Sequence, residues 1–149
     1  ALRYSASARL QGFMDACNSY PGVTPMPLSL DHAGDPANAV LNCIISASPA
    51  PSAVCLCDDE LAIPALFRLR QYGRRIPQDL SLIGFDDLPF SIYSNPPLTT
   101  VRQPIYETGI TLVNTLLGLI ENTEIPPVEL PELSIVVRDT TMPYVCNKD

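Results

Sequence analysis

The sequence has 149 residues, 46% of them hydrophobic, a length and composition that fit one globular domain with a sizeable core. Its net charge is −7, with a single lysine, Lys148, and scattered arginines. A chain so poor in positive charge lacks the basic surface that grips a phosphate backbone, so we do not expect it to bind nucleic acid by itself.

The five cysteines are odd in number, lie mostly within apolar patterns and show no paired metal spacing. This favours free thiols in a reducing, cytoplasmic compartment over disulfides or zinc. We expect no cofactor, no metal and no membrane span; a removed leader stays open because the sequence starts within a helical pattern.

In chain order, apolar residues at helical spacing predict helices at 6–19, 36–47, 60–72 and 104–121. Apolar runs predict strands at 53–57, 80–85 and 133–138, with extended pieces at 24–30 and 98–101. Pro25 and Pro27 reduce the first extended piece to an edge-like or irregular strand. Pro64 is unusual because it lies inside a predicted helix.

The alternation of strands and helices predicts an α/β fold, a parallel sheet with right-handed crossovers and flanking helices. Three successive extended segments end in acid, at Asp31, at Asp58-Asp59 and at Asp86-Asp87. Because the carboxyl ends of parallel strands share one edge of a sheet, we expect an acidic rim where a ligand would bind.

Each acid has a structural interpretation beside the functional one. Asp35 precedes Pro36 and is interpreted as a helix N-cap. For Asp58 and Asp59 capping and binding are equally favoured, since one can cap while the other faces the crevice. Asp86 and Asp87 precede no obvious helix, so a binding role is favoured there.

Three chemistries use carboxylates on such a rim: metal-assisted phosphoryl transfer, glycoside hydrolysis and hydrogen bonding to a polyol. The first lacks a phosphate-binding glycine loop or a nearby lysine, and no nucleophile elbow accompanies the single histidine. Arg9, His32 and Phe85 could add donors and a ring, which favours a neutral, hydroxyl-rich ligand. By themselves, Arg9 would be helix surface and His32 a solvated loop residue.

Several motifs resemble the effector-binding domain of LacI/GalR-type bacterial transcriptional repressors. The motifs are RLQGF at 9–13, PSAVCLCDDELA at 51–62, GRRIPQDLSLIGFDD at 73–87, PPLTTVRQP at 96–104 and VRDTT at 137–141. Each motif taken singly is modest evidence for the family, but together, in register from about Ser5 to Thr141, they are strong evidence.

The resemblance implies a periplasmic-binding-protein-like (type I) domain of two lobes with a sugar or nucleobase effector in the cleft, and no catalytic residue. It implies that residues 1–101 form most of the C-terminal lobe, that 102–132 cross to the N-terminal lobe and that 133–149 return. The motifs that contact effector in the family fall here on four residues: Arg9, His32, Asp58 and Asp86.

The sequence departs from the family pattern at two positions. Asp58 replaces the usual Asn, which exchanges an amide for a charged acceptor. Pro64 stands where Gly is common, so the first turns of that helix are expected to be irregular.

The resemblance also implies a homodimer, formed through an apolar, Pro-bounded loop that carries Phe90, Ile92 and Tyr93. DNA would be bound only through a helix-turn-helix domain that this chain does not contain. The alternative functions are a solute-binding protein of a sugar transporter and, less favoured, a metal-dependent phosphatase using Asp58 and Asp86.

Overall fold

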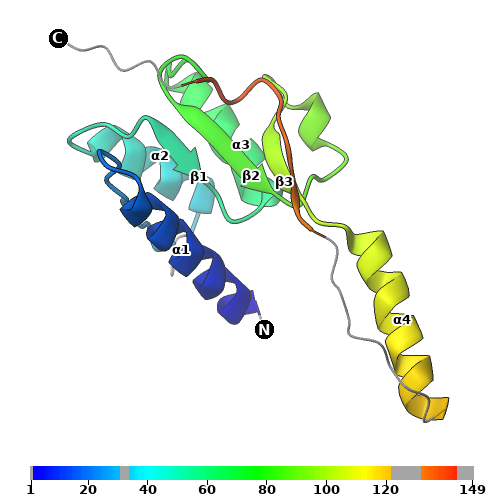
Figure 1. Ribbon diagram of the computed structural model, residues 1–149. Coiled ribbons are helices and arrows are strands. Elements are labelled where there is room, and N and C mark those ends of the chain that lie inside the picture. Colours follow the sequence, from blue (N-terminus) through cyan, green and yellow to red (C-terminus); the bar gives the residue numbers. More distant parts are fainter. Residues whose placement is uncertain (1, 31–33, 122–131, 144–149) are drawn as a thin grey trace.

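The computed structural model describes residues 2–30, 34–121 and 132–143. Four α-helices, one 3-10 turn and four short strands follow one another in these residues (Figure 1). In chain order they are α1 (Leu2–Ser19), α2 (Pro36–Ser46), β1 (Ala53–Cys55), α3 (Asp59–Gln71), β2 (Ser81–Phe85), η1 (Ser91–Tyr93), β3 (Thr99–Arg102), α4 (Ile105–Glu121) and β4 (Ser134–Val136).

The strands form one sheet in the order β1-β2-β3-β4. The first three are parallel, with Ile83 opposite Thr99 and Phe85 opposite Val101, and β4 is antiparallel to β3. Helices α2 and α3 pack together against one face of the sheet, and α1 lies in front of the other face (Figure 1). The predicted α/β class with a mostly parallel sheet and flanking helices is therefore confirmed.

The helix starts follow the predicted capping chemistry. Asp35 accepts a hydrogen bond from the Asn38 amide at 3.1 Å, and Pro36 occupies the first turn of α2. Pro64 lies within α3, which nevertheless runs unbroken from Asp59 to Gln71, so the expected irregularity is not seen. An apolar core joins these two helices to the sheet; it includes Val40, Ile44, Ala65, Leu66, Leu69, Leu80, Leu82 and Leu98.

No strand is assigned to residues 24–30, which are predicted as an extended piece, an edge-like or irregular strand. Pro25 and Pro27 carry no amide hydrogen, so this segment cannot supply the regular row of donors that a sheet ladder requires. β1 is consequently an edge strand of the described sheet. Asp31 and His32 lie outside the described residues.

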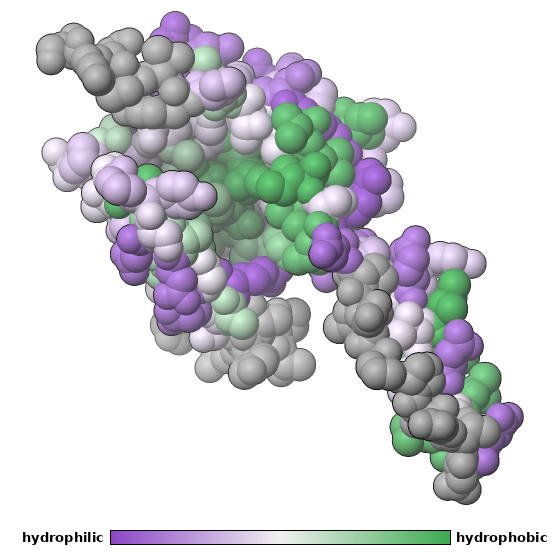
Figure 2. Space-filling model, viewed as in Figure 1, coloured by the Kyte–Doolittle hydropathy of each residue, from purple (hydrophilic) through white to green (hydrophobic). Residues whose placement is uncertain are grey.

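Helix α4 has no buried residue and projects away from the sheet (Figure 1). Its large apolar side chains are exposed along the helix, as Figure 2 shows. They are Ile105, Tyr106, Ile110, Leu112, Val113, Leu116, Leu117, Leu119 and Ile120. Among the described residues, no helix combines the length and the apolar character that crossing a membrane requires.

Candidate functional site

The site begins where β2 ends, in the turn formed by Asp86 and Asp87. Both residues have positive φ angles, 105° and 51°, in a region that most side chains avoid. Such a conformation costs of order 1–3 kcal/mol per residue and persists only where neighbouring groups hold it. One such contact is the Asp86 amide, which donates to the Val101 carbonyl at 2.8 Å and extends the pairing of β2 with β3.

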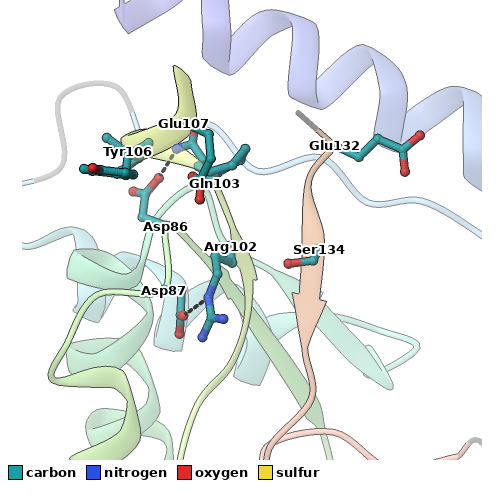
Figure 3. Close-up of a pocket in the computed structure, with 10 residues that line it drawn as sticks. Asp86, Asp87, Arg102, Gln103, Tyr106, Glu107, Glu132 and Ser134 are labelled. Atoms are coloured by element: carbon teal, nitrogen blue, oxygen red, sulfur yellow. Dashed lines mark hydrogen bonds and ion pairs between the residues drawn. The ribbon is translucent and has the colours of Figure 1, made fainter. Parts of the chain in front are cut away.

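Asp86 lines an open cavity of about 360 Å³ between the end of the sheet and the start of α4. Figure 3 shows its carboxylate directed toward Gln103, whose Nε2 donates to Asp86 Oδ1 at 2.5 Å. Tyr106 and Glu107 lie above it at the start of α4, and Glu132 and Ser134 approach from the β4 side. The predicted binding carboxylate thus faces a hollow large enough for a small polar ligand.

Asp87 points away from Asp86 and forms ion pairs with two arginines of the same chain. Its carboxylate, only 8% exposed, accepts from Arg102 Nε at 2.6 Å and from Arg138 Nη2 at 2.5 Å. Burial by itself raises the pKa of Asp87, but the hydrogen bonds from Arg138 and Arg102 outweigh it and hold that pKa below its usual range. Asp87 therefore remains ionised and ties the turn to both ends of the β3–β4 pair.

Asp58 caps α3, with Oδ1 accepting from the Leu61 amide at 2.7 Å. Its other oxygen accepts from Cys57 Sγ at 3.2 Å. Burial first, and then this hydrogen bond and the charge of Asp58, raise the pKa of the Cys57 thiol. Capping, one of the two predicted roles, is what the structure shows for Asp58.

Asp59, the second member of the pair, turns inward and is fully buried. It accepts hydrogen bonds from Ser91, Leu88 and Thr100, which are distant in the sequence. From the sequence, Asp59 is predicted only as an alternative helix cap or crevice residue, and this buried role is not predicted. The signal in the sequence is Gly84, since a Cβ at that position would lie 2.1 Å from Asp59 Oδ1.

Arg9 of α1 lies against the same end of the sheet. Its guanidinium carbon is 4.5 Å from the centroid of the Phe85 ring, the residue just before Asp86. The Arg9 Nε is buried and has no partner among the described residues. The interpretation of Arg9 as solvated helix surface is wrong, because the side chain is half-buried beside β2.

Three of the four predicted site residues can be placed. Arg9 lies over the ring of Phe85, the residue before Asp86, and Asp58 caps α3; His32 lies outside the described residues. The loop after β2 carries three exposed apolar side chains, Phe90, Ile92 and Tyr93, and Tyr93 is 84% exposed. Within the described ranges, no three His, Cys, Asp or Glu residues are grouped to hold a metal ion.

The arrangement offers chemistry for binding. Asp86 supplies oxygen acceptors on the cavity; Arg9 with its donors and the Phe85 ring with its apolar face contact each other one residue earlier in the chain and are not among the residues that line the cavity. A hydroxyl-rich small molecule uses all three kinds of group.

The chain resembles known proteins in both sequence and structure. The model of the periplasmic binding protein-like domain matches residues 2–141. The ribose operon repressor of Haemophilus influenzae is 36% identical over 119 residues, covering 78% of this chain and 36% of that protein.

Solved structures of transcriptional regulators also superpose on this chain. A LacI family transcriptional regulator from Bifidobacterium animalis subsp. lactis superposes with a TM-score of 0.69 at 28% identity, covering 74% of this chain and 40% of that one. The lac repressor dimer bound to operator and the anti-inducer ONPF gives 0.65 at 29% identity, covering 72% and 37%. The chain thus spans less than half the length of each of these proteins.

Proposed function

The chain belongs to the periplasmic-binding-protein-like family, as the effector-binding domain of LacI-family regulators, and on that premise we propose that it senses a small effector for a bacterial transcriptional repressor. The effector is sugar-like and binds in a cleft between two lobes, where it modulates DNA binding by a separate helix-turn-helix domain. Such a protein works on chromosomal DNA and is therefore cytoplasmic. The relatives reported above are named as regulators of transcription, which favours this function over an enzyme or the solute-binding protein of a transporter.

One observation carries the effector site. At the end of β2 a carboxylate on a cavity, Asp86, follows a ring that Arg9 covers at 4.5 Å. The carboxylate lines the cavity, and the ring and the guanidinium lie beside its strand, at the end of an open α/β sheet where a ligand crevice is expected. We assign ligand contacts to Arg9, Asp58, Asp86 and His32, with Asp58 using an oxygen beyond its capping bond.

The exposed α4 supports the proposed domain division. β3 and β4 pair side by side, with Arg102 opposite Ser134, so the chain leaves the sheet at about 102 and returns beside its point of departure. Between these points α4 buries nothing against the sheet. Residues 1–101 then form one lobe, 102–132 belong to the second, and 133–149 return to the first.

The dimer is assigned to the loop after β2, where exposed Phe90, Ile92 and Tyr93 lie together in sequence around η1. Clustered aromatic and aliphatic side chains of this kind are enriched at the centres of protein interfaces. The lac repressor that superposes on this chain is described as a dimer.

The function is tested by calorimetry of the protein with a panel of neutral monosaccharides and nucleosides, including D-ribose, D-glucose, adenosine and cytidine. We expect at least one to bind, and Asp86→Ala to weaken it by about 1.5–3 kcal/mol, the range for a hydrogen bond to a charged group. Asp15→Asn, on the exposed surface of α1, is the control. Unchanged affinity in a folded Asp86→Ala variant would refute the assignment of Asp86.

A further inference from the structure

Asp59 is a fully buried carboxylate that the proposed ligand contacts do not use. It accepts three hydrogen bonds, from Ser91 Oγ at 2.5 Å, from Thr100 Oγ1 at 2.7 Å and from the Leu88 amide at 3.0 Å. None of these donors belongs to α3, the helix that Asp59 begins. Burying a carboxylate is costly unless its oxygens are satisfied, so these three contacts define what Asp59 does.

The partners of Asp59 surround the turn that carries Asp86. Leu88 and Ser91 follow the turn, and Thr100 lies on the neighbouring strand β3. The Thr100 hydroxyl donates to Asp59 Oδ1 and also accepts from the Asp87 amide at 3.3 Å. Because Asp59 takes the hydroxyl proton, the lone pairs of Thr100 are left to face that amide.

We propose that Asp59 is the positioning residue of the effector site. It acts through Thr100 and Leu88 to hold the left-handed backbone of Asp86 and Asp87, and so directs the Asp86 carboxylate into the cavity. The inference rests on the proposed function only for its last step, the effect on ligand affinity. The structural step concerns the backbone alone.

Asp59 packs tightly against Gly84 of β2. A Cβ on Gly84 would lie 2.1 Å from Asp59 Oδ1 and 3.0 Å from Leu98 Cδ2, so the carboxylate rests directly on the backbone of β2. Asp59 contacts β2 on one side and bonds to the loop after β2 on the other. It therefore fixes the distance between the strand and the loop. This is the geometry required of a group that sets the path of the turn.

Asp59→Asn tests the chemistry with almost no change of shape. All three partners donate to Asp59, and an amide replaces one acceptor oxygen with a donor. The amide oxygen can stay toward Ser91 and Leu88 while the amide nitrogen turns to Thr100, whose hydroxyl then accepts. The Leu88 amide thereby exchanges a charged acceptor for a weaker, neutral one. Ser91→Ala is a milder variant that removes one donor and leaves Asp59 in place. Asp35→Asn is the control, because Asn caps a helix as well as Asp does.

The first measurement needs no ligand. Backbone NMR couplings and chemical shifts report φ at Asp86 and Asp87, and amide hydrogen exchange reports the Leu88 bond. In Asp59→Asn we expect both φ angles to move toward negative values and Leu88 exchange to quicken at least tenfold. Ser91→Ala should give a smaller change in the same direction and Asp35→Asn none. If Asp59→Asn does not fold, Ser91→Ala decides.

The second measurement is calorimetry with D-ribose, or with another panel compound that binds the wild type. We expect affinity to fall at least tenfold for folded Asp59→Asn and to be unchanged for Asp35→Asn. A purely structural Asp59 would lower the unfolding midpoint and leave both φ and affinity intact, which would overturn the proposal. If the wild type binds no compound, the proposed function fails, and the NMR measurement still decides the role of Asp59.

Discussion

Replacing Asp87 with asparagine should destabilise the fold by about 2–3 kcal/mol. Removing one partner of a buried ion pair typically costs about 3–5 kcal/mol, because the other charge stays buried. Arg138 is only 15% exposed and keeps one bond, from Nη1 to the Leu98 carbonyl at 2.7 Å. Arg102 is 57% exposed and can turn to water, and the amide oxygen still accepts one bond, so the cost falls below that range.

Asparagine is chosen because it tolerates the positive φ of 51° at position 87, so the variant changes charge and not backbone preference. Urea unfolding measures the effect: with a slope of about 2 kcal/mol/M, the midpoint should fall by about 1–1.5 M. Arg102→Gln is the matched control and should cost at most about 1 kcal/mol, the upper value for an exposed pair. A midpoint for Asp87→Asn within about 0.3 M of the wild type would refute this account of the ion pairs.

Three further predictions concern pH, the dimer and α4. Burial raises the pKa of Asp87, but the bonds from Arg138 and Arg102 lower it further, so its stabilisation is present above the unfolded pKa of about 3.9 and is lost as pH falls through the folded value. The difference in urea midpoint between wild type and Asp87→Asn should be constant from about pH 5 to 7 and decrease steadily as the pH falls below about 4. A difference that grows as the pH falls below about 4 would contradict this. Tyr93→Asp should shift a micromolar dimer to monomer in sedimentation velocity while Tyr20→Asp, also at an exposed tyrosine, does not; an unchanged Tyr93→Asp dimer would remove this loop from the interface. Leu116→Glu on the exposed face of α4 should reduce self-association of these 149 residues, measured by light scattering. Asn114→Glu adds the same charge at a polar position and should reduce it less. A wild type that is a compact monomer with α4 amides protected from exchange would argue against this.

The elements that the sequence predicts well are those whose signals are local. Helix α2 needs only Asp35 as acceptor and Pro36 in its first turn, and both act within four residues. The central strand needs only an apolar run that stops at a pair of acids. By contrast, a strand at 24–30 depends on a partner to pair with, and no pattern inside that segment reports whether one is there.

The site is predicted less completely because identical residue types take opposite roles. Asp58 and Asp59 are neighbours of the same chemistry, but the first lies before the helix and caps it, while the second is its first residue and faces the core. Asp86 and Asp87 likewise separate into a cavity residue and an ion-pair residue. Arg138 is 51 positions from Asp87, so their contact follows from the antiparallel return of β4 and from no local spacing.

The two carboxylates of the turn are both held from the base of the segment that carries α4. Gln103 donates to Asp86, and Arg102, one residue earlier, donates to Asp87. Only Pro104 separates these contacts from the first residue of α4. The turn is thus tied to the two residues from which the chain departs toward α4. A ligand that replaces Gln103 on Asp86 releases the first of these two hydrogen bonds and leaves the second in place. If the effector binds Asp86 as proposed, it competes with Gln103 for this carboxylate, at the residue just before Pro104 and α4.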